Sequence, residues 1–79
     1  MVQKIRKSAL LGSGIRTYRT KQGLTQEQMT AKLQLLGCNI SRGTYAKIEA
    51  GIRNIDVSEL NTILRMLHIS YEDLLDPEE

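Results

Sequence analysis

A chain of 79 residues, 41% of them hydrophobic, predicts one small globular domain rather than a disordered tail. The single cysteine, Cys38, excludes an internal disulfide and fits a reducing compartment. No apolar run exceeds three residues, which argues against a membrane span and against the core of a secretion signal. We therefore expect a cytoplasmic protein.

Charge is distributed unevenly along the chain. Residues 1–53 carry ten Lys or Arg residues against two acids, a formal charge of +8, whereas residues 54–79 carry one basic residue against seven acids, a formal charge of −6. A basic front and an acidic back predict one face for a polyanion. A pattern that only aids solubility is the alternative, and charge alone does not decide between them.

Helix signals recur along the chain, and alternating strand patterns are missing. The first predicted helix covers about 8–22, with a start left open by Gly12 and Gly14. Thr25 precedes the second helix, and Gln28 three positions later completes a capping-box pattern. The second helix runs to Gly37 on an apolar stripe of Met29, Leu33 and Leu36.

Three shorter helices are predicted in the second half. Ser41 opens the third helix, which places Tyr45 and Ile48 on its inner face. Asp56 and Glu59 mark the start of the fourth. Its inner stripe consists of Leu60, Ile63, Leu64 and Leu67. A last short helix follows Ser70 and contains Leu74 and Leu75. Five short helices joined by short turns predict a compact all-α domain.

Three segments, taken together, resemble the Cro/C1-type (XRE-like) helix-turn-helix family. They are LTQEQMTAKL at 24–33, SRGTYAKIEAGIR at 41–53 and LNTILRMLHISYEDLL at 60–75. The resemblance covers residues 11–76 and implies a lambda-repressor-like five-helix bundle in which helices 2 and 3 form the helix-turn-helix. Residues 1–10 are then a basic N-terminal arm or the start of helix 1, and residues 77–79 an acidic tail.

The resemblance implies roles for residues of helix 3. The family pairs an acid here with an Arg of helix 1, which assigns Arg19 and Glu49 to a structural ion pair. Arg42 and Lys47 lie at base-reading positions, where Arg42 suits a guanine edge and Lys47 a base or a phosphate. The alternative for both is a solvated basic face.

Gly43 either lets the backbone approach the groove or belongs to the turn, if helix 3 starts late. Thr44 contacts a phosphate or a thymine methyl group, or else bonds locally to the helix end.

Further DNA-binding positions flank the two helices. In the family, a Gln at the head of helix 2 holds a phosphate, which assigns that role to Gln26. The alternative is a solvent-exposed residue of the first turn. Arg53 and Asn54 follow helix 3, where the family touches the DNA backbone again. At the N-terminus, Lys4, Arg6 and Lys7 form either an arm over phosphates or a tail without a role.

Two departures from the family pattern stand out. Between Leu33 and Ser41 the chain reads QLLGCNI, about five residues more than usual, so either the turn is longer or helix 2 gains a turn. This brings Asn39 near the DNA face as an additional contact. His68 replaces the usual Gly after helix 4, and His tolerates the left-handed backbone of a helix end.

Other chemistry finds little support. One His and one Cys do not build a zinc site, no Gly-rich phosphate loop is present, and no nucleophile is paired with a base. We expect no enzymatic activity, no metal and no cofactor. Cys38 is a passive small residue or, alternatively, a redox thiol.

The sequence thus predicts sequence-specific binding of double-stranded DNA by a small transcriptional regulator, a repressor that occludes its site. We expect a homodimer, with no membrane partner and no small-molecule effector. Self-association is expected around helices 4 and 5, at Ile69, Tyr71, Leu74 and Leu75, unless these residues close the domain's own core. The alternative function is a protein-interaction module on the same fold, such as an antitoxin or accessory factor.

Overall fold

Five α-helices make up residues 7–75, the part of the chain that the computed structural model describes. They are α1 (Lys7–Lys21), α2 (Gln26–Leu35), α3 (Arg42–Glu49), α4 (Val57–Leu67) and α5 (Tyr71–Leu75). This range contains no strand, so the predicted all-α class is confirmed. Residues 7–10 belong to α1, and the predicted arm residues Lys4 and Arg6 and the predicted tail at 77–79 lie outside the described range.

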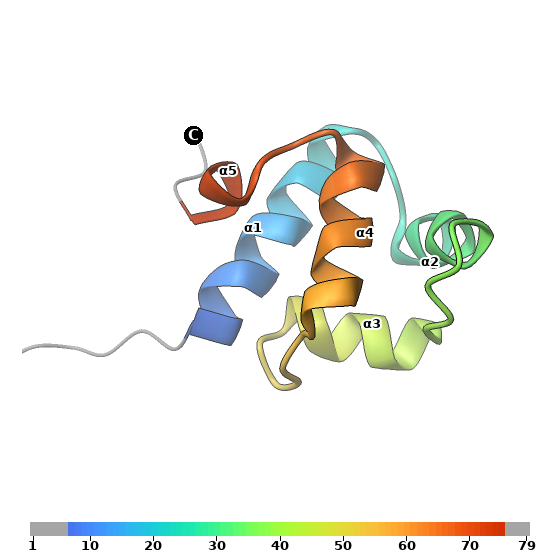
Figure 1. Ribbon diagram of the computed structural model, residues 1–79, viewed down its shortest axis with the longest axis horizontal. Coiled ribbons are helices and arrows are strands. Elements are labelled where there is room, and N and C mark those ends of the chain that lie inside the picture. Colours follow the sequence, from blue (N-terminus) through green and yellow to red (C-terminus); the bar gives the residue numbers. More distant parts are fainter. Residues whose placement is uncertain (1–6, 76–79) are drawn as a thin grey trace, which may run out of the picture.

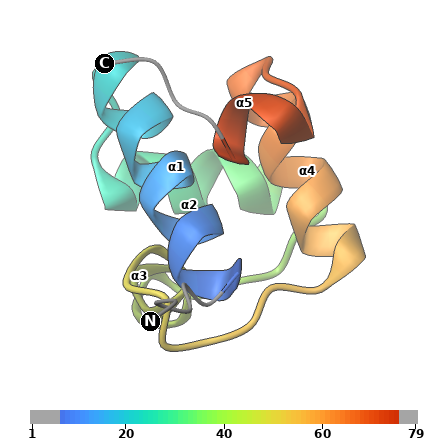
Figure 2. The same ribbon diagram turned by 90° about the vertical axis from the view of Figure 1, so that its left-hand side faces the viewer.

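The central helix is α1, which contacts α3, α4 and α5, while α2 packs against α3 and α4. In Figure 1, α3 lies below α2, and these two helices run in clearly different directions. Figure 2 shows α5 nearest the viewer, in front of α4 and next to α1. No helix within residues 7–75 has the length and apolar character that crossing a membrane requires.

Local capping chemistry starts the helices where the sequence predicts. The Thr25 hydroxyl accepts a hydrogen bond from the amide of Gln28, whose side chain accepts one from the Thr25 amide. Asp56 and Glu59 form the same reciprocal pair at α4. Such pairs satisfy amide groups that a helix start leaves without partners, so these starts need no tertiary contact.

The first four helices end in one common way. After each, the next amides bond back to carbonyl groups of the last turn, and one residue takes a positive φ. Those residues are Gly23, Gly37, Gly51 and His68. His68 has φ 58° and ψ 45°, which confirms the predicted left-handed end of α4 without a glycine.

The core draws apolar residues from every helix and from the α2–α3 connection. Its buried members are Leu11, Ile15, Met29, Leu33, Ile40, Tyr45, Ile48, Ile63, Leu67 and Leu74. The predicted inner position of Leu36 is wrong, because this side chain is 50% exposed. Ile40, which no periodicity marked, is buried instead. Leu74 is fully buried and Ile69, Tyr71 and Leu75 pack against the core, as the alternative to self-association requires.

The α2–α3 connection explains this exchange. The amide of Cys38 bonds to the carbonyl of Leu33 and that of Gly37 to Gln34, which closes the end of α2. The chain then turns inward, and the Gln34 side chain donates to the Ile40 carbonyl at 2.9 Å. Of the additional residues, Gln34 and Leu35 extend α2, and residues 36–41 form the connection.

Gly12 and Gly14, which made the predicted start of the first helix uncertain, both lie inside α1. A Cβ on Gly12 would overlap the carbonyl oxygen of Ile48 and lie 2.7 Å from that of Glu49. A Cβ on Gly14 would lie 2.5 Å from the carbonyl oxygen of Leu74. The two glycines therefore let α1 approach the backbones of α3 and α5 closely. The close approach at Gly12 fixes the position of α3 relative to α1.

Candidate nucleic-acid interface

The outward face of α3 is basic and exposed to solvent. Tyr45, Ile48 and Glu49 are buried, which turns the opposite face of the helix to solvent. This face carries Arg42, Gly43, Ala46 and Lys47. Arg42 and Lys47 are exposed, and neither forms an ion pair or side-chain hydrogen bond within residues 7–75. Both cations are available to an external anion.

The start of α3 settles the position of Gly43. Ser41 caps the helix, and Arg42 is its first residue, so Gly43 lies within the first turn. The alternative in which helix 3 starts late is wrong. A Cβ on Gly43 would meet no atom within 4 Å, so the fold itself does not require glycine here.

Thr44 takes part in the cap of α3. The Ser41 hydroxyl accepts a hydrogen bond from the Thr44 amide at 3.1 Å and donates one to the Thr44 hydroxyl at 3.0 Å. The local bond that the sequence left open is therefore present. Since a hydroxyl oxygen can still donate its own proton, Thr44 retains one donor for a ligand.

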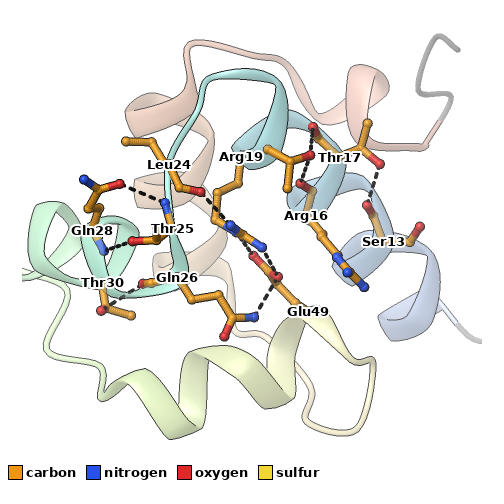
Figure 3. A network of polar contacts seen from close by, with 11 residues as sticks. Ser13, Arg16, Thr17, Arg19, Leu24, Thr25, Gln26, Gln28, Thr30 and Glu49 are labelled. Carbon is orange, nitrogen blue, oxygen red and sulfur yellow. Dashed lines mark hydrogen bonds and ion pairs between the residues drawn. The ribbon is translucent and has the colours of Figure 1, made fainter.

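A buried ion pair fixes α3 to α1. Arg19 donates to Glu49 from Nε at 2.6 Å and from Nη2 at 3.0 Å, and the two side chains are 8% and 2% exposed. The third guanidinium nitrogen of Arg19, Nη1, donates to the carbonyl of Leu24 at 2.6 Å. Figure 3 shows Arg19 reaching from α1 to Glu49 at the end of α3.

Gln26 joins the same network from the start of α2. Its Nε2 donates to Glu49 Oε1 at 3.0 Å, as Figure 3 shows. The α2 start and the α3 end are thereby tied to one carboxylate. The sequence predicted either a phosphate contact or a solvent-exposed position for Gln26, and not this bond to Glu49. A phosphate contact by Gln26 therefore has to use the second proton of the Nε2 amide group of this half-buried side chain.

The network shifts the titration of its members. Burial by itself raises the pKa of Glu49, but its interactions with Arg19, Tyr45 and Gln26 outweigh burial and hold this pKa below its usual value. Burial is also the main reason that the pKa of Tyr45 is raised. The Tyr45 hydroxyl is buried near the pair and has no hydrogen-bond partner within residues 7–75.

Residues that flank α3 differ in whether their side chains are already paired within the domain. Arg53 donates to Glu59 from Nη1 at 3.1 Å and from Nη2 at 3.0 Å, so its charge is already paired. The bond from Arg53 is the main cause that lowers the pKa of Glu59. Asn54 and Asn39 are exposed, at the far and near ends of α3. Asn39 thus lies within two residues of the cap of α3.

Within residues 7–75, no three His, Cys, Asp or Glu side chains gather closely enough to hold a metal ion. Cys38 is free and partly buried. Burial, followed by the nearby acids Glu59 and Asp56, raises the pKa of its thiol. The thiolate is the reactive form, so this environment favours the passive role over the redox role.

Two helices joined by a turn, the second with an exposed basic face, define a helix-turn-helix domain. The sequence matches the helix-turn-helix family model over residues 15–74, and the chain belongs to this Cro/C1-type (XRE-like) family. The family and the predicted fold are thus confirmed, and the domain is of a DNA-binding type. No curated protein and no solved structure matches the chain.

Proposed function

We propose that this protein binds double-stranded DNA in a sequence-specific manner and acts as a small transcriptional repressor. The observation that carries the proposal is the outward face of α3, on which Arg42 and Lys47 are exposed and have no partner among residues 7–75. A helix of this kind fits the major groove, where Arg bonds to the O6 and N7 atoms of guanine. Repression follows if the bound domain excludes polymerase from the site.

The remaining contacts are assigned by position. Lys47, Thr44 and Asn39 lie beside Arg42 around α3, and Gln26 at the start of α2 and Asn54 beyond α3 reach the phosphate backbone on either side. Arg53 contributes to phosphate binding only as far as its pair with Glu59 allows. The absence of a side chain at Gly43 lets the backbone of α3 approach the bases closely.

The proposal is tested by selecting bound sequences from a random duplex pool of about 30 bp, a length that holds two half-sites about 10 bp apart. An enriched inverted repeat would support a homodimer, and a single enriched half-site would support a monomer. No enrichment with folded protein would contradict the proposal and favour the protein-interaction module.

Matched variants make the test specific to α3. Arg42→Ala should relax the preference at one base pair and weaken binding by about 1–3 kcal/mol. Lys47→Ala should weaken binding to all sequences and reduce the salt slope by about 1 if it holds a phosphate. Arg65→Ala removes another exposed cation, near the C-terminal end of α4, and should change neither the base preference nor the salt slope. Equal losses in all three variants would point to non-specific electrostatics instead.

A further inference from the structure

A second surface of the domain combines exposed apolar side chains with exposed cations. The C-terminal ends of α2 and α4 form a groove of about 460 Å³. We call it the α2–α4 groove, and its lining residues are Lys32, Leu35, Leu36, Arg65, Met66 and His68. None of these residues belongs to the outward face of α3.

The apolar part of the groove is not explained by folding. Leu35 is 86% exposed and Leu36 50% exposed, next to each other in the chain and beside Met66. The end of α2 is closed by main-chain bonds and by the inward side chains of Leu33 and Cys38, so it does not need either exposed leucine. Adjacent exposed leucines in a groove are typical of a surface that another molecule covers.

The charged part of the groove indicates the chemistry of that molecule. Lys32 and Arg65 are exposed and form no ion pair within residues 7–75, and no acid lines the groove. A second copy that docked face to face would bring these cations against their own counterparts, which is unfavourable. Nucleic acid would satisfy the cations but would leave Leu35 and Leu36 against a hydrated backbone.

We propose that the α2–α4 groove binds an acidic amphipathic helix of a partner protein. Its apolar side chains pack on Leu35, Leu36 and Met66, and its carboxylates pair with Lys32 and Arg65. Helix-in-groove binding uses this combination of apolar anchors and a charged rim.

The groove lies at the C-terminal end of α4, whose eleven residues extend about 16 Å, and Figure 1 shows that this end of α4 points away from α3. A partner docked at the groove therefore leaves the outward face of α3 open. The inference is independent of the proposed DNA binding, since it uses neither Arg42 nor Lys47.

The experiment is a titration of the isotope-labelled full chain, followed by amide chemical shifts. The probe is a synthetic helical peptide with Leu at i, i+3, i+4 and i+7 and Glu elsewhere. One matched peptide has Lys for every Glu, and another has Ser for every Leu. A short DNA duplex is a further probe. We expect the acidic Leu peptide alone to shift amides of residues 32–36 and 65–68.

Two variants and a control complete the test. Leu35→Ser with Leu36→Ser should weaken binding of the acidic peptide at least tenfold, whereas Ile52→Ser, at an equally exposed apolar site, should not. Lys32→Glu with Arg65→Glu should abolish that binding and create binding of the Lys peptide. Amide spectra verify that each variant is folded.

Three results would overturn the proposal. One is no shift with the acidic peptide at about 1 mM. Another is a shift of the groove amides by duplex DNA alone, which would assign the groove to nucleic acid. The third is a shift of the same amides on dilution of the free protein, which would assign it to a second copy.

Discussion

Replacing Glu49 by Ala tests the buried ion pair most directly. The carboxylate accepts hydrogen bonds from two nitrogens of Arg19 and one of Gln26, and only 2% of the side chain is exposed. Its loss leaves the Arg19 guanidinium, whose side chain is 8% exposed, with the Leu24 carbonyl as its one remaining partner among these contacts. Water cannot easily replace the carboxylate at such a site.

Breaking a buried pair by removing one partner costs roughly 3–5 kcal/mol. A domain of this size has a total stability of roughly 4–12 kcal/mol, so Glu49→Ala removes a large part of it. At about 4–8 °C per kcal/mol, a loss of about 4 kcal/mol lowers Tm by roughly 15–30 °C. Urea unfolding followed by circular dichroism at 25 °C and pH 7 measures the loss.

A double-mutant cycle separates the pair from ordinary packing. Arg19→Leu with Glu49→Leu removes both charges together and should cost clearly less than the sum of the two single changes. Gln26→Ala removes one bond at the edge of the network and should cost about 1–2 kcal/mol. Strict additivity in the cycle, or a Glu49→Ala protein whose stability is unchanged within 0.5 kcal/mol, roughly the additivity error, would refute the reasoning.

Three further predictions concern the same fold. Gly12→Ala should destabilise it by roughly 3 kcal/mol in urea unfolding, because the new Cβ overlaps the backbone of α3; Gly43→Ala, in open space on α3, should instead stabilise it by up to about 1 kcal/mol, and equal effects would contradict the proposed packing. His68→Gly should raise stability by about 0.5–1 kcal/mol, because glycine adopts the left-handed backbone without strain; a lower Tm would show that the His68 side chain itself stabilises the fold. Stability should be steady above pH 4.5, the ordinary pKa of Glu, and fall as acid protonates Glu49 and Glu59, whose pKa values are lowered on folding; stability that rises on acidification would show that burial outweighs their hydrogen bonds.

The basic face of α3 illustrates how far the sequence alone could go. The spacing of Tyr45 and Ile48 places Arg42 and Lys47 on the opposite side of a helix, and the structure has them there. The family resemblance supplied Arg19 as the partner of Glu49, and the two side chains are bonded in the structure. Neither inference required coordinates. Helix periodicity fixes which side chains share a face, and the family motif names the partner of Glu49.

Other features of the site came from long-range contacts. The bond from Gln26 to Glu49 spans 23 positions, and nothing at either residue marks the other as its partner. In the sequence, Gly12 only made the start of the first helix uncertain. In the structure, the carbonyl of Ile48 lies directly against it. Two glycines in one helical pattern were the signal available, and it did not reveal which backbone approaches them.

Local chemistry therefore determined where the helices start and end. Caps such as Thr25 with Gln28, and the left-handed residue His68, act over three to five positions of the same chain. The tertiary structure alone decided that Ile40 is buried while Leu36 faces solvent, since both are apolar and only the path of the α2–α3 connection separates them. Burial depends on which distant atoms fill the space beside a side chain, and that information is not local to any segment.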